Sequence, residues 1–88
     1  MKKVAIIPNI LRDKNYSGTK KIIEVIKENN IDVVADKSLA NSKLNVEYVD
    51  ISTYMDIDMA IIVGGDGTIL SCGKNYINTD IPILGINF

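Results

Sequence analysis

A cluster of glycines around one aspartate and one threonine is the part of the chain best suited to chemistry. Gly64-Gly65-Asp66-Gly67-Thr68 directly follows the apolar run Met59–Val63. The run is typical of a buried strand, and Ile69–Ile77 has the pattern of a helix. Such a strand–turn–helix junction presents backbone N–H groups that favour phosphate, and glycine lets the backbone approach a ligand closely. The sequence therefore predicts contact with a nucleotide or another phosphorylated molecule, centred on Asp66.

Two residues of this motif also have a plainer interpretation. Asp-Gly is a common turn pair, so Asp66 can shape the turn instead of contacting a substrate. Thr68 can cap the following helix or offer its hydroxyl to a phosphate, and both roles stay open. We favour ligand contact for Asp66 because a buried strand and two glycines precede it.

The rest of the chain predicts strands that alternate with helices. Apolar runs of strand length lie at residues 4–7, 32–35, 59–63 and 83–86. Thr19–Glu28 is amphipathic and predicts a helix, with Ser17 or Asn15 as its N-cap and Asn29–Asn30 at its end. This alternation predicts one α/β domain over residues 1–88, with a mostly parallel sheet flanked by helices.

Two stretches have a weaker pattern. Ile10–Gly18 is polar and is expected to form a loop. Residues 46–51 fit either a short strand or an extended segment, and residues 52–54 fit the start of a helical turn. Asp56 and Asp58, ahead of the next strand, are expected to be solvated or turn residues.

Three polar or glycine positions lie at or just after the ends of predicted strands. They are Asn9, Gly64 and Asn87. In open parallel sheets, ligands lie beyond the carboxyl ends of the strands. We therefore expect these positions to converge on one crevice, together with Asp66.

Composition excludes several classes of function. The net charge is −1, and charged residues are spread through all 88 positions, so neither nucleic acid nor a membrane surface is an expected partner. No apolar stretch is long enough to span a bilayer, and no signal peptide is apparent. Cys72 is the only cysteine and histidine is absent, which excludes an internal disulfide and a structural zinc site and fits a cytoplasmic protein.

Two motifs together resemble the NAD kinase family. The first is the Gly64–Thr68 string, which is similar to the signature shared by NAD kinases, lipid kinases and phosphofructokinases. The second is Ile81–Phe88, which is similar to the Pro-x-Leu-Gly-Ile-Asn strand of NAD kinases at the same spacing. The resemblance covers the whole chain and implies a Rossmann-like N-terminal domain. Family members continue with a second, β-rich domain, so residues 1–88 are expected to be a fragment.

The resemblance implies transfer of the γ-phosphoryl group of ATP to the 2′-hydroxyl of NAD, giving NADP. Asp66 would be the catalytic base. The nucleotides would be bound by the following residues: Gly64, Gly65, Gly67, Thr68 and Asn87. Mg²⁺ is expected on the ATP phosphates, with no metal held by the protein itself. The parent enzyme is expected to be a homo-oligomer, and the isolated chain to be nearly inactive.

The chain departs from the family at one position and leaves two other functions open. Many NAD kinases have a basic or imidazole side chain where Ser71 stands, and serine cannot supply that charge to a phosphate. A lipid or sugar kinase of the same superfamily is an alternative. However, Ile69–Gly73 lacks the acidic residue and asparagine of lipid kinases, and phosphofructokinases prefer serine at position 68. The other alternative is a nucleotide-binding module without catalysis.

Overall fold

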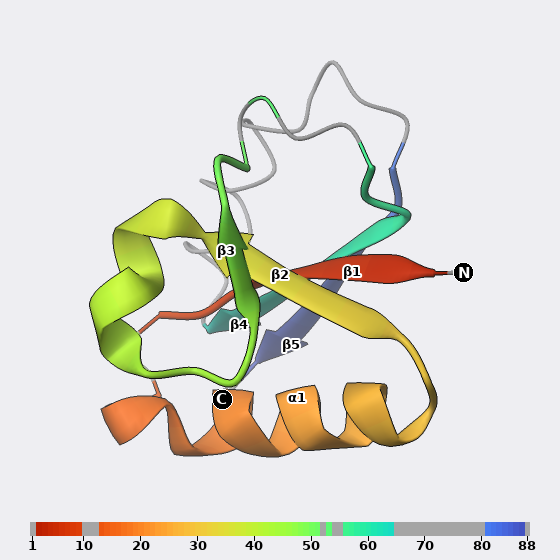
Figure 1. Ribbon diagram of the computed structural model, residues 1–88. Helices are drawn as coiled ribbons and strands as arrows, with labels where there is room; N and C mark the ends of the chain where they lie inside the picture. Colours follow the sequence, from red (N-terminus) through yellow and green to blue (C-terminus); the bar gives the residue numbers. More distant parts are fainter. Residues whose placement is uncertain (1, 10–12, 52, 54–55, 65–80, 88) are drawn as a thin grey trace.

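The chain folds around one parallel β-sheet (Figure 1). The computed structural model describes residues 2–9, 13–51, 53, 56–64 and 81–87. Within these residues the sheet has five strands in the order β3-β2-β1-β4-β5, and every neighbouring pair is parallel. The strands are β1 (Lys3–Ile7), β2 (Asp32–Asp36), β3 (Glu47–Val49), β4 (Met59–Gly64) and β5 (Ile83–Asn87). The predicted α/β fold is confirmed.

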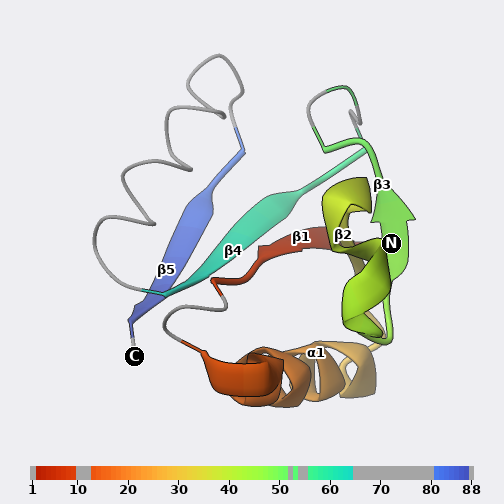
Figure 2. The same cartoon turned by 90° about the vertical axis from the view of Figure 1, so that its left-hand side faces the viewer.

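Side chains alternate between two buried faces of the sheet. Val4 and Ile6 of β1 belong to the core cluster that contains the buried isoleucines of helix α1 (Ser17–Glu28). Ala5, between them, packs with Val34 in a second cluster that has no residue from α1. This alternation follows from the two-residue period of a strand. Figure 2 shows α1 running along one face of the sheet. Because both faces are covered in the central strands, their sequences are continuous apolar runs.

Helix α1 buries one side and ends where the sequence predicts. Ile23 and Ile26 are buried against the sheet, and Thr19 is buried near the start of the helix. At the end, the N–H of Asn29 donates to the carbonyl of Ile26. Asn30 then takes a left-handed conformation with φ 59°, which asparagine tolerates after a helix. The helix begins at Ser17, two residues before the predicted start.

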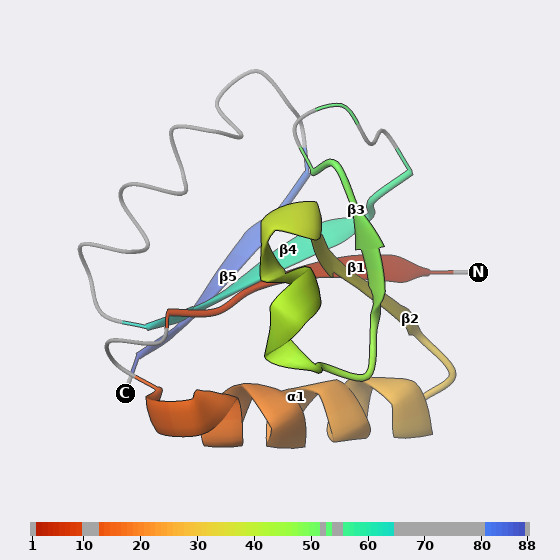
Figure 3. The same ribbon diagram turned by 60° about the vertical axis from the view of Figure 1, so that its left-hand side comes forward.

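Two short 3₁₀ helices lie in segments that have little apolar periodicity. The predicted loop over residues 10–18 is partly wrong, because η1 (Lys14–Tyr16) and the first two residues of α1 lie within it. The second is η2 (Lys37–Ser42), which follows β2 and lies beside β3 in Figure 3. Of the two alternatives for residues 46–51, the short strand is confirmed as β3.

Some predictions concern residues that the structure does not describe. The helix predicted after residue 68 lies outside the described ranges, as do Ser52 and Tyr54 of the predicted helical turn. Among the helices that are described, none has the length and apolar character needed to cross a membrane.

The strand order contains a topological switch point between β1 and β4, where successive strands begin to be added on the other side of β1. From the central strand β1 the chain moves outward to β2 and β3, and then returns to the other side of β1 to form β4 and β5. In open α/β sheets, ligands bind in the crevice beyond the carboxyl ends of the two strands at such a switch point. Here those strands are β1 and β4, which pair directly from Val4 and Met59 to Ile7 and Ile62.

Candidate functional site

The carboxyl edge of the sheet gathers the positions that the sequence singled out. β1 ends at Ile7, two residues before Asn9, and β4 ends at Gly64. β5 ends at Asn87, which pairs directly with Gly64 in the parallel register. All strands run in the same direction, so these ends lie at one edge. Gly64 and Asn87 thus end neighbouring strands at this edge, and Asn9 follows the end of β1. Their predicted convergence with Asp66 on one crevice stays a prediction.

Gly64 is suited to the point where β4 leaves the sheet. It is buried, and its φ of 156° is a positive value that glycine adopts without the steric penalty of a side chain. The three residues before it are also buried, so the strand holds its end firmly. β4 therefore ends at a buried, firmly held position, and its last residue adds no Cβ atom there.

The central part of the predicted site remains a prediction. Gly65, Asp66, Gly67 and Thr68 lie outside the described residues. For Asn87 the structure places the backbone in β5 but does not describe the side chain. The structure thus fixes the two strand ends that flank the motif, Gly64 and Asn87.

A buried carboxylate fills the N-terminal end of α1 on the other side of the switch point. Asp13 is only 5% exposed. Its Oδ1 accepts a hydrogen bond from the N–H of Gly18 at 2.8 Å, and its Oδ2 accepts from the N–H of Thr19 at 2.7 Å. The Thr19 hydroxyl, from a side chain with no exposed area, donates to the same Oδ2 at 2.6 Å. We call Asp13 with its donors Ser17, Gly18 and Thr19 the Asp13 seat.

These hydrogen bonds favour the charged form of Asp13. Burial raises the pKa of its carboxyl group. The hydrogen bonds from Thr19, Gly18 and Ser17 lower the pKa, and their combined effect is larger than that of burial, so the pKa lies below its ordinary value. Hydrogen bonds to a carboxylate from backbone N–H groups have this effect because they stabilise the anion. The first turn of α1 therefore holds a negative charge supplied by the chain itself.

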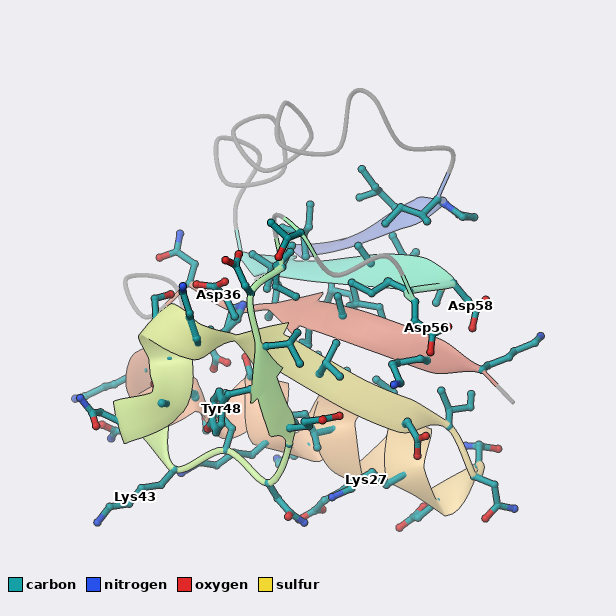
Figure 4. The ribbon with its side chains drawn as sticks, turned by 45° about the horizontal axis from the view of Figure 1, so that its top comes forward. Lys27, Asp36, Lys43, Tyr48, Asp56 and Asp58 are labelled. Atoms are coloured by element: carbon teal, nitrogen blue, oxygen red, sulfur yellow. The ribbon has the colours of Figure 1, made fainter. Side chains whose placement is uncertain are left out.

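A second aspartate is engaged in the same way at the end of β2. Oδ2 of Asp36 accepts from the N–H of Ser38 at 3.1 Å, and Oδ1 accepts from the N–H of Ile51 at 3.2 Å. The Ser38 side chain lowers the pKa of Asp36, burial raises it, and nearby backbone N–H groups lower it further, with a net decrease. Asp36 thus begins η2 and ties the end of β2 to the segment after β3 (Figure 4).

The acidic residues before β4 lie at the opposite edge of the sheet. The carboxylate of Asp58 accepts from the N–H of Lys3 at 2.8 Å, at the amino end of β1. Asp56 is 3.6 Å from the Lys3 ammonium group, and its side chain is 83% exposed. Both are visible beside the start of β1 in Figure 4. Their predicted role as solvated or turn residues is confirmed, and they are remote from the candidate crevice.

Two of the residues that organise this edge were not found from the sequence. We predicted Ser17 or Asn15 as the N-cap of α1, and this prediction is wrong, because the carboxylate of Asp13 accepts the helical N–H groups instead. For Asp36 the sequence motifs predict no particular role. The usable signal for Asp13 was its charge and its position just ahead of the predicted helix, where acidic residues are favourable.

In the part of the chain that the structure describes, no three aspartate, glutamate, cysteine or histidine side chains lie close enough together to coordinate an ion.

Comparison with known proteins yields one consistent result. The family described as the ATP-NAD kinase N-terminal domain matches residues 4–88. The NAD kinase of Lachnoclostridium phytofermentans is 39% identical over 88 residues, which cover 99% of this chain and 30% of the relative. The NAD kinase of Natranaerobius thermophilus is 37% identical over 92 residues, covering 99% and 31%. That of Bacteroides fragilis is 32% identical over 92 residues, covering 97% and 32%. The chain therefore spans about 30% of the length of these relatives.

Proposed function

The chain belongs to the ATP-NAD kinase family, matching its N-terminal domain, and from this premise we propose that it forms part of an NAD kinase. The proposed reaction moves the γ-phosphoryl group of ATP to the 2′-hydroxyl of the adenosine ribose of NAD. The products are NADP and ADP. The names of the relatives support the substrate NAD, and the geometry of the carboxyl edge supports a nucleotide site.

The direct pairing of Gly64 with Asn87 is the observation that carries the proposal. The two residues belong to different motifs, and the parallel register brings them side by side at the carboxyl edge next to the switch point. A ligand in this crevice can contact both motifs at once. Phosphoryl transfer depends mainly on positioning and on neutralising the charge of the transferring group. A rigid strand end that leads into a glycine-rich turn meets the first of these needs.

Asp66 is the residue that we assign to proton transfer. Its carboxylate would accept the proton of the ribose 2′-hydroxyl as the oxygen attacks the γ-phosphorus of ATP. A well-placed base contributes roughly 10²–10⁴-fold to the rate. Backbone N–H groups of Gly65 and Gly67 would contact phosphate oxygens, and the Thr68 hydroxyl would either join them or cap the next helix. The side-chain amide of Asn87 would hydrogen-bond the nucleotide.

Magnesium would enter with ATP. Within the described residues, no group of three acidic, cysteine or histidine side chains could hold the ion. Mg²⁺ commonly binds phosphate oxygens and water with few protein ligands. In this proposal the ion is therefore part of the Mg-ATP substrate, and the residues of this chain orient the nucleotides.

The test is NADP formation from NAD and Mg-ATP by the full-length protein, followed with an NADP-specific dehydrogenase. The 88-residue chain is assayed beside it and is expected to form little NADP, since its relatives are about three times longer. Activity in the full-length protein supports the proposal. If the full-length protein is folded but makes no NADP, the proposal is wrong and lipid or sugar substrates should be assayed next.

A further inference from the structure

The first βαβ unit has two places where a sheet of this strand order commonly receives a dinucleotide. One is the N-terminus of the helix after β1, whose N–H groups bind the pyrophosphate. The other is an acidic residue near the end of β2, which binds a ribose hydroxyl. In this chain both places are engaged by internal contacts, at Asp13 and at Asp36.

In the Asp13 seat, the anion at the N-terminus of α1 is a side chain of the protein itself. The carboxylate accepts two backbone N–H groups of α1 and the Thr19 hydroxyl, all within 2.8 Å. The Ser17 hydroxyl lies 3.5 Å from Oδ1. An anion at a helix N-terminus is stabilised by the same N–H groups and by the helix dipole. A phosphate arriving here would meet a buried negative charge that already uses these donors.

The backbone around Asp13 turns so that the carboxylate faces the first N–H groups of α1. The N–H of Asp13 donates to the Asn9 carbonyl at 2.9 Å, and the Asp13 carbonyl accepts from the N–H of Tyr16 at 2.9 Å. Asn15 and Tyr16 both have a φ of 56°, in the left-handed region that costs energy for residues other than glycine. Such strain persists when surrounding contacts hold it in place, and the hydrogen bonds of Asp13 are the contacts found here.

The acidic residue at the end of β2 is also committed to the protein. Each carboxylate oxygen of Asp36 accepts a backbone N–H, from Ser38 and from Ile51. Binding a ribose hydroxyl would require these contacts to share or release the carboxylate. The observation is independent of Asp13 and points in the same direction, because both positions of the usual dinucleotide contact in this unit already carry internal hydrogen bonds.

We propose that Asp13 is an internal anion that takes the place of a ligand phosphate at the N-terminus of α1 and so directs the phosphate groups of the nucleotide to the β4 side of the switch point. The replacement of a ligand phosphate by Asp13 concerns this chain alone. The placement of the nucleotide phosphates on the β4 side rests on the proposed function. Asp13 is accordingly a positioning residue, because its carboxylate occupies the N–H groups of Gly18 and Thr19 and excludes a second anion from them.

The first experiment asks whether removing the carboxylate opens the seat. The thermal midpoint of full-length Asp13→Ala is measured in sodium phosphate and in sodium chloride at equal ionic strength. Two controls are Asp32→Ala, which removes an exposed acid, and Asp13→Asn, whose amide still fills the seat. We expect phosphate to raise the midpoint of Asp13→Ala by several degrees more than that of either control, because an anion that binds only the folded state stabilises it. An equal response in all three proteins would overturn the proposal.

The second experiment uses the wild-type protein and covers the case in which Asp13→Ala does not fold. The protein is labelled with ¹⁵N-glycine and titrated with Mg-ATP, because Gly18 and Gly64 report on the two sides of the switch point. The proposal expects the amide resonance of Gly64 to move while that of Gly18 stays in place. Movement of Gly18 as the ligand binds would refute it. If neither resonance moves, the proposed function fails, whereas the unchanged Gly18 amide still agrees with a filled seat.

Discussion

Replacing Thr19 with valine removes one hydrogen bond from the Asp13 seat and keeps the shape of the side chain. The lost bond is the 2.6 Å contact from the Thr19 hydroxyl to Oδ2 of Asp13, between a side chain with no exposed area and one that is 5% exposed. Hydrogen bonds to charged groups contribute about 1.5–3 kcal/mol. Helix propensities of valine and threonine are similar. Since two backbone N–H groups still hold the carboxylate, we expect a loss of about 2 kcal/mol in the free energy of unfolding at neutral pH.

The assay is urea denaturation of Thr19→Val, with Thr53→Val as the matched control. Thr53 is exposed, and its hydroxyl is 3.4 Å from the Asp50 carbonyl. The control should therefore change stability by no more than about 0.5 kcal/mol. A lower midpoint with an unchanged slope would identify a true stability loss in Thr19→Val. Equal stability of the two variants would refute the claim that the Thr19 hydroxyl supports a buried carboxylate.

The same variant has a defined dependence on pH. The folded-state pKa of Asp13 is lowered, and an unfolded aspartate titrates near about 3.9. The contribution of the carboxylate to stability is therefore fully present above the unfolded pKa and is lost as the pH falls through the lower folded pKa. Because the Thr19 hydroxyl is one cause of the lowering, the gap between wild type and Thr19→Val should narrow below about pH 4. A constant gap down to that range would mean that the lost stability comes from packing instead.

Three further substitutions test other parts of the argument. Ile23→Ala removes a side chain that is 2% exposed and should cost about 2–5 kcal/mol by urea denaturation, whereas Val25→Ala on the same helix, 57% exposed, should be nearly neutral. Asp36→Ala should lower stability by about 1–3 kcal/mol, because the N–H of Ile51 loses its acceptor, and hydrogen exchange at that amide should quicken. In the full-length protein, Asp66→Asn should reduce kcat roughly 10²–10⁴-fold with an unchanged circular dichroism spectrum, and near-normal turnover would remove Asp66 as the base.

The central strands β1, β2 and β4 could be predicted from the sequence because they are buried on both faces of the sheet. β5 is also an apolar run, although Ile83 and Leu84 are 39% and 48% exposed. Four of the five described strands coincide with continuous apolar runs, and their ends differ from prediction by one residue. The fifth, β3, has only three residues at the edge of the sheet, and a run that short does not distinguish a strand from an extended segment. The strand order was out of reach, because it depends on which faces the crossovers cover and not on any local pattern.

The start of α1 could not be predicted because the side chain that accepts its first N–H groups lies farther back in the sequence than capping residues usually do. A capping side chain ordinarily bonds to an N–H group two or three residues later. Asp13 bonds to Gly18 and Thr19, which are five and six residues later, because η1 folds the intervening residues back. Local rules favoured Ser17 and Asn15. The role of Asp36 could not be predicted for a similar reason, because its second hydrogen-bond partner, Ile51, lies 15 residues away in the sequence.

The spacing of the two family motifs has a geometric cause. A parallel pair of strands needs a crossover of about a dozen or more residues, and residues 65–82 provide it between β4 and β5. The register that pairs Ala60 with Ile83 then brings Gly64 opposite Asn87 at the carboxyl edge. A change in that register by one residue would turn every side chain of β5 to the other face of the sheet. This pairing therefore keeps Gly64 and Asn87, which belong to two motifs distant in sequence, next to each other. In our proposal a phosphate is received at their edge, because the Asp13 carboxylate already fills the N-terminus of α1.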